Sequence, residues 1–232
     1  MKGVSNMKRL IVLLVAGFFL LLTGRLSNAQ TISGTPHNLS SSGTGTVKSN
    51  TSEICVFCHT PHSQTATTLL WNRNNSTASY TVYSSSWMNQ TAGQPGADSK
   101  LCLSCHDGTV GFNSLINGPG DVSNVTMTGS THMTGADSIG TDLTNDHPVG
   151  IVYQTALTAD ASGFHTISTT GGTFGSNVYV ANGGNKVPLS GSSSATASVE
   201  CTSCHNPHNN VNGDFLRVSN NSSALCLTCH NK

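Results

Sequence analysis

The chain has 232 residues, of which 9% are charged and 6% are aromatic, and its formal net charge at pH 7 is zero. Ordinary domains have roughly 25% charged residues, so this chain is poor in charge as well as in large apolar side chains. Its side chains alone would build a weak core. The zero net charge, with no basic stripe in the sequence, argues against a nucleic-acid partner.

The N-terminus has the three parts of a secretion signal. A positively charged segment precedes an almost continuous apolar run of about 13 residues, and small residues follow before Gln30. The run is shorter than the ~20 residues that a membrane-spanning helix needs. We therefore expect residues 1–29 to be cleaved and the mature chain to have no membrane span. The protein should be exported, with the extracellular space or cell surface as the first expectation and the periplasm as the second.

All eight cysteines fall into four Cys-x-x-Cys-His boxes. The boxes are Cys55-Cys58-His59, Cys102-Cys105-His106, Cys201-Cys204-His205 and Cys226-Cys229-His230. They divide the mature chain into an N-terminal arm (30–54), a first two-box module (55–106), a cysteine-free, Gly/Ser/Thr-rich middle (107–200) and a second two-box module (201–232). We expect these parts to form one domain after cleavage.

The two modules are copies of one repeat. Both open with Cys-x-x-Cys-His-x-Pro-His and close with Leu-Cys-Leu-x-Cys-His. The opening motifs span 55–62 and 201–208, and the closing motifs span 101–106 and 225–230. An apolar pair follows the second His of each opening motif by seven residues, which aligns Leu69-Leu70 with Phe215-Leu216. The first copy then has an insertion of about 22 residues that contains Trp87.

Covalent haem attachment is a chemistry that requires the whole box. Two thiols add to the two vinyl groups of one porphyrin, and the adjacent His reaches the iron as its proximal ligand. Zinc sites use paired Cys-x-x-Cys knuckles but do not demand a His after each. Four disulfides that each span two residues would close only small loops. The sequence therefore predicts four haem c groups, which would also supply the apolar core that the side chains lack.

The predicted site residues follow from the boxes. The residues expected to bind haem covalently are Cys55, Cys58, Cys102, Cys105, Cys201, Cys204, Cys226 and Cys229. The proximal iron ligands are expected to be His59, His106, His205 and His230.

Two further histidines lie close to a proximal ligand. His62 and His208 each follow a box His by three residues, with a Pro between. A residue so close to its own haem cannot reach the opposite face of that ring, so each should be the distal ligand of a different haem. For His208 we expect the other haem of its own module.

One histidine precedes each module and is a second kind of distal candidate. His37 precedes the first module and His147 precedes the second, with His165 as the reserve for His147. His132 is expected to face solvent. With these ligands every iron would be held by two histidines.

These motifs, together with Asp-His-Pro-Val-Gly at 146–150, resemble the doubled Cys-x-x-Cys-His multihaem cytochromes c. More narrowly, the chain is similar to the tetrahaem extracellular cytochromes of metal-reducing bacteria that polymerise into conductive filaments, or nanowires. The resemblance implies bis-His haems in alternating stacked and T-shaped pairs, with His37, His62, His147 and His208 as the distal set. It also implies identical subunits joined head to tail by a His of one subunit on a haem of the next. We favour His62 for that role, with His37 second.

The fold expected from these features is mostly irregular coil wrapped on a stack of haems that forms the core. Short helices should occur at each box, and a few short strands should occur in the middle, as at 151–153 and 177–180.

The function expected is electron conduction without substrate chemistry, with other redox proteins or extracellular acceptors as partners. A monomeric periplasmic electron shuttle is the alternative. A multihaem reductase of a small nitrogen oxyanion is a further one, although it requires a haem with an open iron position and the six histidines outside the boxes are enough to cap every iron. A structural zinc or disulfide module is the remaining alternative.

The composition generates a first prediction. If the haems supply the core, the chain expressed without haem attachment should not fold. Circular dichroism and thermal melting of the haem-free chain should show no cooperative transition. A compact apo-protein that melts cooperatively would contradict this account of the core.

Overall fold

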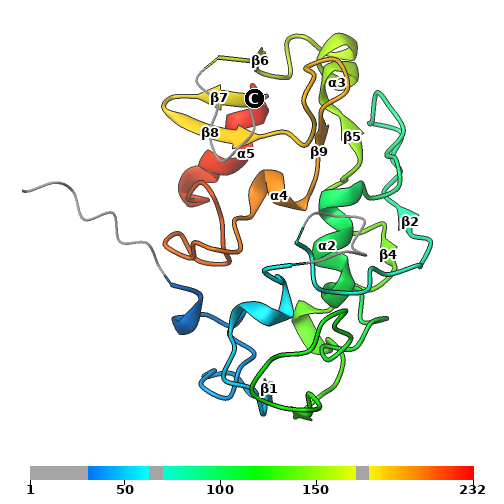
Figure 1. The fold of residues 1–232 in the computed structure, drawn as a ribbon. Helices are drawn as coiled ribbons and strands as arrows, with labels where there is room; N and C mark the ends of the chain where they lie inside the picture. Colours follow the sequence, from blue (N-terminus) through cyan, green and yellow to red (C-terminus); the bar gives the residue numbers. More distant parts are fainter. Residues whose placement is uncertain (1–30, 63–69, 171–177) are drawn as a thin grey trace, which may run out of the picture.

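The computed structural model describes residues 31–62, 70–170 and 178–232, so the predicted signal segment 1–29 lies outside it (Figure 1). Most of the described chain is irregular, as predicted. The helices are α2 (Ala97–His106), α3 (Tyr153–Ala159), α4 (Cys201–Cys204) and α5 (Ala224–Cys229), with 3-10 helices η1 (Ile32–Gly34), η2 (Cys55–Phe57), η3 (Gly135–Asp137) and η4 (Asn221–Ser223). Within these ranges no helix combines the length and the apolar character needed to cross a membrane.

The strands are short and form small separate sheets. They are β1 (Lys48–Ser49), β2 (Thr81–Val82), β3 (Met127–Thr128), β4 (Asp142–Leu143), β5 (Ile151–Val152), β6 (Ile167–Ser168), β7 (Tyr179–Asn182), β8 (Asn185–Pro188) and β9 (Ser198–Val199). β1 pairs with β3 and β5 with β9, both antiparallel, whereas β2 pairs with β4 in parallel. β6, β7 and β8 form an antiparallel three-stranded sheet, and α5 packs against β7 and β8.

The boxes lie on helical segments, as predicted, but the middle of the chain differs in part. The strand predicted at 151–153 ends at Val152, because Tyr153 begins α3. Tyr153 is 1% exposed, and its hydroxyl donates to the carbonyls of His165 at 2.8 Å and Cys229 at 3.1 Å. This burial fixes the turn between strand and helix. The other predicted strand is β7, which starts at Tyr179; position 177 lies outside the described residues.

Side chains form only small apolar clusters. The clusters consist of Tyr153, Val178, Val180, Leu189 and Ala197; of Tyr80, Leu103 and Leu143; and of Ala92, Ile151 and Ala156. In the N-terminal arm the buried side chains are polar. They are Thr35, Asn38, Ser40, Ser49 and Thr51. This pattern matches the composition, and a haem stack as the core stays a prediction.

The two modules share a turn after their first box, which corrects the sequence alignment by one residue. The N–H of Thr60 donates to the Leu70 carbonyl at 3.0 Å, and the N–H of Asn206 donates to the Phe215 carbonyl at 2.7 Å. Leu70 and Phe215 both have positive φ, 60° and 55°, which is uncommon for residues other than glycine. Leu69 was aligned with Phe215 and lies outside the described residues; the structural counterpart of Phe215 is Leu70.

A buried arginine ties the first module together. Arg73 is 2% exposed, and its guanidinium donates to the carbonyls of Ser104, Gly111 and Phe112 at 3.1, 2.8 and 2.7 Å. Its Nε donates to the Ser104 hydroxyl at 3.3 Å. These bonds join the turn after the first box to the end of α2, which holds the second box.

Arg73→Met should remove this set of bonds and leave buried carbonyls without partners. We expect the free energy of unfolding to fall by on the order of 3 kcal/mol. Denaturant unfolding followed by absorbance measures the change. The matched control is Lys100→Met on half-buried α2 surface, which should shift the midpoint little; equal shifts for the two variants would contradict the role of Arg73.

Candidate haem-binding sites

Each box forms one helical turn. The box His N–H donates to the carbonyl of the first Cys in three boxes, at 2.8 Å for His59, 3.0 Å for His205 and 2.9 Å for His230. The remaining box lies within α2. Residues three and four apart lie on one face of a helical turn, so the two thiols and the His of a box are presented together. This local geometry is what covalent attachment at the two thiols and ligation by the adjacent His require.

The thiols are unpaired, and six of the eight are half-buried. All eight cysteines are free, which leaves the disulfide alternative without a bridge in the structure. Burial, with Cys105 nearby, raises the pKa of Cys58 to about 11; burial with Cys201 and Cys226 nearby raises that of Cys204 to about 11. Across the described ranges no three His, Cys, Asp or Glu side chains converge on a common point where a metal ion could be held. The box thiols thus lack the four-ligand arrangement of a structural zinc site.

Two box histidines have an orientation suited to metal ligation. Nδ1 of His106 lies 2.9 Å from the carbonyl of Asp137, and Nδ1 of His205 lies 2.8 Å from the carbonyl of Asp214. A carbonyl only accepts, so Nδ1 is the protonated nitrogen and Nε2 keeps its lone pair. Metal-bound histidines are held by such second bonds. The donor set therefore fits a haem iron bound through Nε2.

Three of the four box histidines face a histidine from another segment. The ring centroids lie 6.2 Å apart for His37 and His106, 5.9 Å for His59 and His208, and 6.4 Å for His147 and His230. Metal–imidazole bonds are about 2 Å long, so two imidazoles on opposite sides of one metal ion have centroids about 6 Å apart. All three pairs have this separation.

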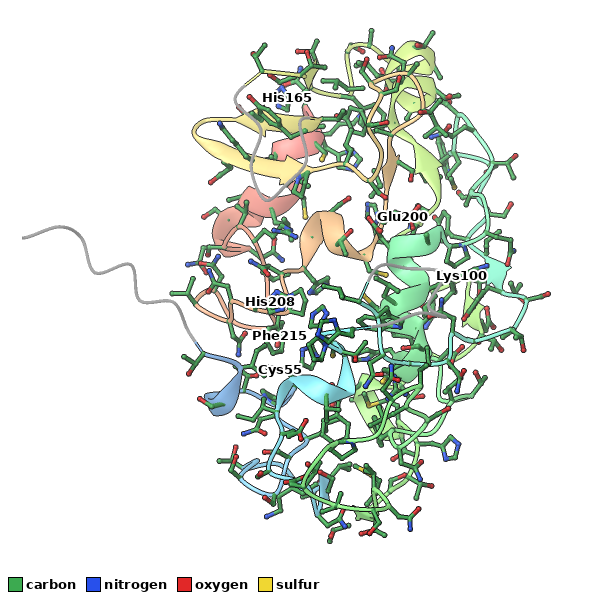
Figure 2. All side chains as sticks on the ribbon, viewed as in Figure 1. Cys55, Lys100, His165, Glu200, His208 and Phe215 are labelled. Carbon is green, nitrogen blue, oxygen red and sulfur yellow. The ribbon has the colours of Figure 1, made fainter. Side chains whose placement is uncertain are left out.

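The partner of His208 differs from the sequence prediction. We expected His208 to join the two boxes of its own module, but its ring stacks at 16° on His59 of the first module. The loop that holds His208 and Phe215 faces the segment that begins at Cys55 (Figure 2). The two modules are therefore packed against each other through this loop, which the local spacing of motifs could not show.

His37 and His147 each lie opposite the second box of the module that they precede, a pairing that the sequence had left open. His37 is half-buried, and burial, with His106 nearby, lowers its pKa to about 4. It is consequently neutral at pH 7 and keeps a lone pair for a metal. Its ring also stacks on Phe215, with centroids 4.2 Å apart and planes at 10°.

The third box differs from the other three. His205 is exposed, and the ring contacts found in the described part of the chain do not include one to it. His62 is also exposed and is not brought to another histidine there. His165 is half-buried, with its backbone N–H bonded to the Cys229 carbonyl at 2.9 Å, and His132 is exposed.

Thiols of successive boxes lie near one another. The thiols of Cys102 and Cys201 interact, which lowers the pKa of Cys201 to about 7 and, together with burial, raises that of Cys102 well above its usual value. Cys105 lies within electrostatic range of Cys58, and Cys204 lies within electrostatic range of the cysteines of the last box. In sequence order, each box thus has a thiol near a thiol of the next.

A buried carboxylate holds the contact between the second and third boxes. Glu200 is 2% exposed and lies between α4 and α2 (Figure 2). It accepts hydrogen bonds from the Gly96 N–H at 3.0 Å, the Ser198 hydroxyl at 2.8 Å and the Ser99 hydroxyl. Ser99 in turn accepts from the Cys201 N–H at 3.0 Å. This network fixes α2 against α4, and with them the thiols that adjoin.

Neither Glu200 nor Phe215 was predicted to be a site residue. A signal for Glu200 existed: it is one of ten acidic residues in a charge-poor chain and directly precedes a box. Phe215 was assigned to an apolar pair of the repeat, but nothing local in the sequence indicates that it stacks on His37.

Glu200→Gln should weaken the contact between the two modules, because a neutral amide accepts less strongly and places an N–H against the serine donors. We expect a loss of about 1–3 kcal/mol in the free energy of unfolding. Asp98→Asn is the matched control: Asp98 is on α2 beside Ser99 and accepts from the Ser190 hydroxyl at 2.7 Å, at a half-buried site. The denaturant midpoints of the two variants measure the loss of stability. If Glu200→Gln loses no more stability than the control, the role of Glu200 is refuted.

Comparison with known proteins bears on the second module. The family model described as the doubled CXXCH motif matches residues 194–232, and no curated protein matches the chain. The matched segment contains the third and fourth boxes and Glu200. Together with the box geometry, the match supports a multihaem c-type cytochrome with covalently attached haem c and a role in electron transfer.

Proposed function

We propose that the chain is a tetrahaem cytochrome that conducts electrons and polymerises into an extracellular filament. The eight box cysteines hold four haems, and the box histidines are their proximal ligands. Haem c, when bound, supplies an iron that gains and loses one electron. The distal ligands are His208 opposite His59, His37 opposite His106, His147 opposite His230, and His62 of a neighbouring subunit opposite His205.

The observation that supports the filament proposal is the pattern of histidine pairs. The second box of each module is paired with the His that precedes that module: His37 for the first and His147 for the second. The first box of the first module is paired with His208, which belongs to the following module. The same rule assigns to the first box of the second module, His205, the corresponding His of a third module. In an assembly that residue is His62 of the next subunit.

Such a contact joins two different surfaces of the subunit. The donor is His62 in the first module, and the acceptor is His205 in the second. A heterologous contact of this kind extends into an open filament unless its rotation closes a ring. The low charge of the chain permits close packing of subunits. His37, the second choice for this role, already faces His106 within the chain.

The exposed His205 also favours a second candidate function. A box His without a distal imidazole would leave one iron position open, as a multihaem reductase of a small nitrogen oxyanion requires. A monomeric shuttle would instead need a distal ligand for His205 from its own chain. The three functions therefore predict different coordination in the isolated subunit and in the assembly.

The experiment combines a haem count with imaging. A pyridine haemochrome assay should give four haems per chain, and electron microscopy of protein sheared from the cell surface should show filaments. Uniform monomers with only low-spin haems would support the shuttle. Monomers with one high-spin haem that binds nitrite would support the reductase, and both results would overturn the filament.

His62→Ala should abolish filaments and convert one haem per chain from a low-spin to a high-spin state, because His205 then has no opposing imidazole. The matched control is His132→Ala, since His132 is also exposed and faces no box. Electron microscopy and resonance Raman spectra measure the two effects. Intact filaments of the His62 variant, with four low-spin haems, would rule out His62 as the ligand.

A further inference from the structure

The two modules contact each other through three interactions, and the residues that make them have counterparts elsewhere in the repeat. The thiol of Cys201 interacts with that of Cys102. The Ser99 hydroxyl, three residues before Cys102, accepts the Cys201 N–H at 3.0 Å. Phe215 stacks on His37. We call this set of contacts the module junction.

The repeat supplies a counterpart for each residue of the module junction. Cys201 corresponds to Cys55 and Cys102 to Cys226, since these are the first cysteines of equivalent boxes. Ser99 corresponds to Ser223, which also lies three residues before its Cys. Phe215 corresponds to Leu70 by its positive φ and shared turn, and His37 corresponds to His147 by its pairing.

The counterparts are exposed. Cys55 and Cys226 are the two exposed cysteines, whereas the other six are at least partly covered. Leu70 is 40% exposed, and His147 and Ser223 are exposed as well. Two of the five counterparts, Cys55 and Leu70, belong to the first module, which also contains His62. The other three, Cys226, Ser223 and His147, lie around the last box. The molecule thus presents the two halves of a module junction on different surfaces.

We propose that the interface between successive subunits repeats the module junction, with a second copy of this chain as the partner. Cys55 of the next subunit lies beside Cys226, its N–H donates to the Ser223 hydroxyl, and Leu70 of the next subunit packs on the His147 ring. This inference rests on the proposed filament and names the surface that forms it.

The pairing assigns a role to exposed apolar atoms that the isolated chain leaves in water. Leu70 gains a contact on the imidazole face equivalent to that of Phe215 on His37, and burial of apolar surface stabilises association. It also brings the thioether side of the last box of one subunit to that of the first box of the next. The order of boxes in space, first to fourth, then continues without a break from subunit to subunit.

The insertion in the first module provides a matched control. It has no counterpart in the second module, so residues within it lie outside the repeated junction. Trp87 belongs to the insertion and is 92% exposed. Trp87→Ser therefore removes a larger exposed apolar side chain than Leu70→Asp but leaves the proposed interface intact.

The test compares assembly of the holoprotein and its variants by electron microscopy and light scattering. Leu70→Asp should raise the concentration needed for assembly roughly tenfold or more, Leu70→Phe should assemble at least as well as the parent chain, and Trp87→Ser should match it. Low-spin haem signals from the three boxes paired within the chain confirm that Leu70→Asp is folded. As a second measurement on the parent filament, the Cys226–Cys55 sulfur separation across subunits should match the Cys102–Cys201 separation within one.

The outcomes separate this inference from the function on which it rests. If His62→Ala prevents assembly but Leu70→Asp assembles like Trp87→Ser, the filament stands and the repeated junction is refuted. Distant Cys226 and Cys55 sulfurs in the filament would refute it as well. If the parent chain forms no filament at all, the proposed function and this inference both fail.

Discussion

The structure depends on imidazoles from distant segments that face each other at the separation of two ligands on one metal ion. The pairs join residues 149, 83 and 69 positions apart in sequence, His59 with His208, His147 with His230, and His37 with His106. The side-chain clusters are too small to position these segments on their own. Ligand bonds across a haem would supply the missing cohesion, which explains how a chain with so little charge and so few aromatic residues holds one arrangement.

Local chemistry determined which parts of this arrangement could be predicted. The box spacing predicts a helical turn with its thiols and His on one face, and each box forms that turn. The repeat predicted that His37 and His147 precede equivalent modules. The partner of His208 could not be predicted, because spacing limits what a residue can reach but does not say which module packs against it. Tyr153 begins a helix because of tertiary burial, which the alternating pattern around it does not contain.

Buried polar groups hold segments of this chain together, as apolar residues do in most domains. Glu200 bonds to both helices at the module junction, and Arg73 bonds to three carbonyls in the first module. Each is almost fully buried, so the loss of either leaves donors or acceptors unsatisfied. Glu200 is thus placed where the modules meet, and Arg73 is placed inside the first module. The exposed counterparts of the module junction suggest that subunits meet by the same design.

In the proposed filament one box, that of His205, receives its second imidazole from another subunit. The most direct measurement is the number of high-spin haems per chain in the parent protein, determined by electron paramagnetic resonance before assembly and in filaments. We expect one high-spin haem in the separate subunit and none in the filament. Four low-spin haems in the separate subunit, or a high-spin haem that persists in the filament, would contradict it.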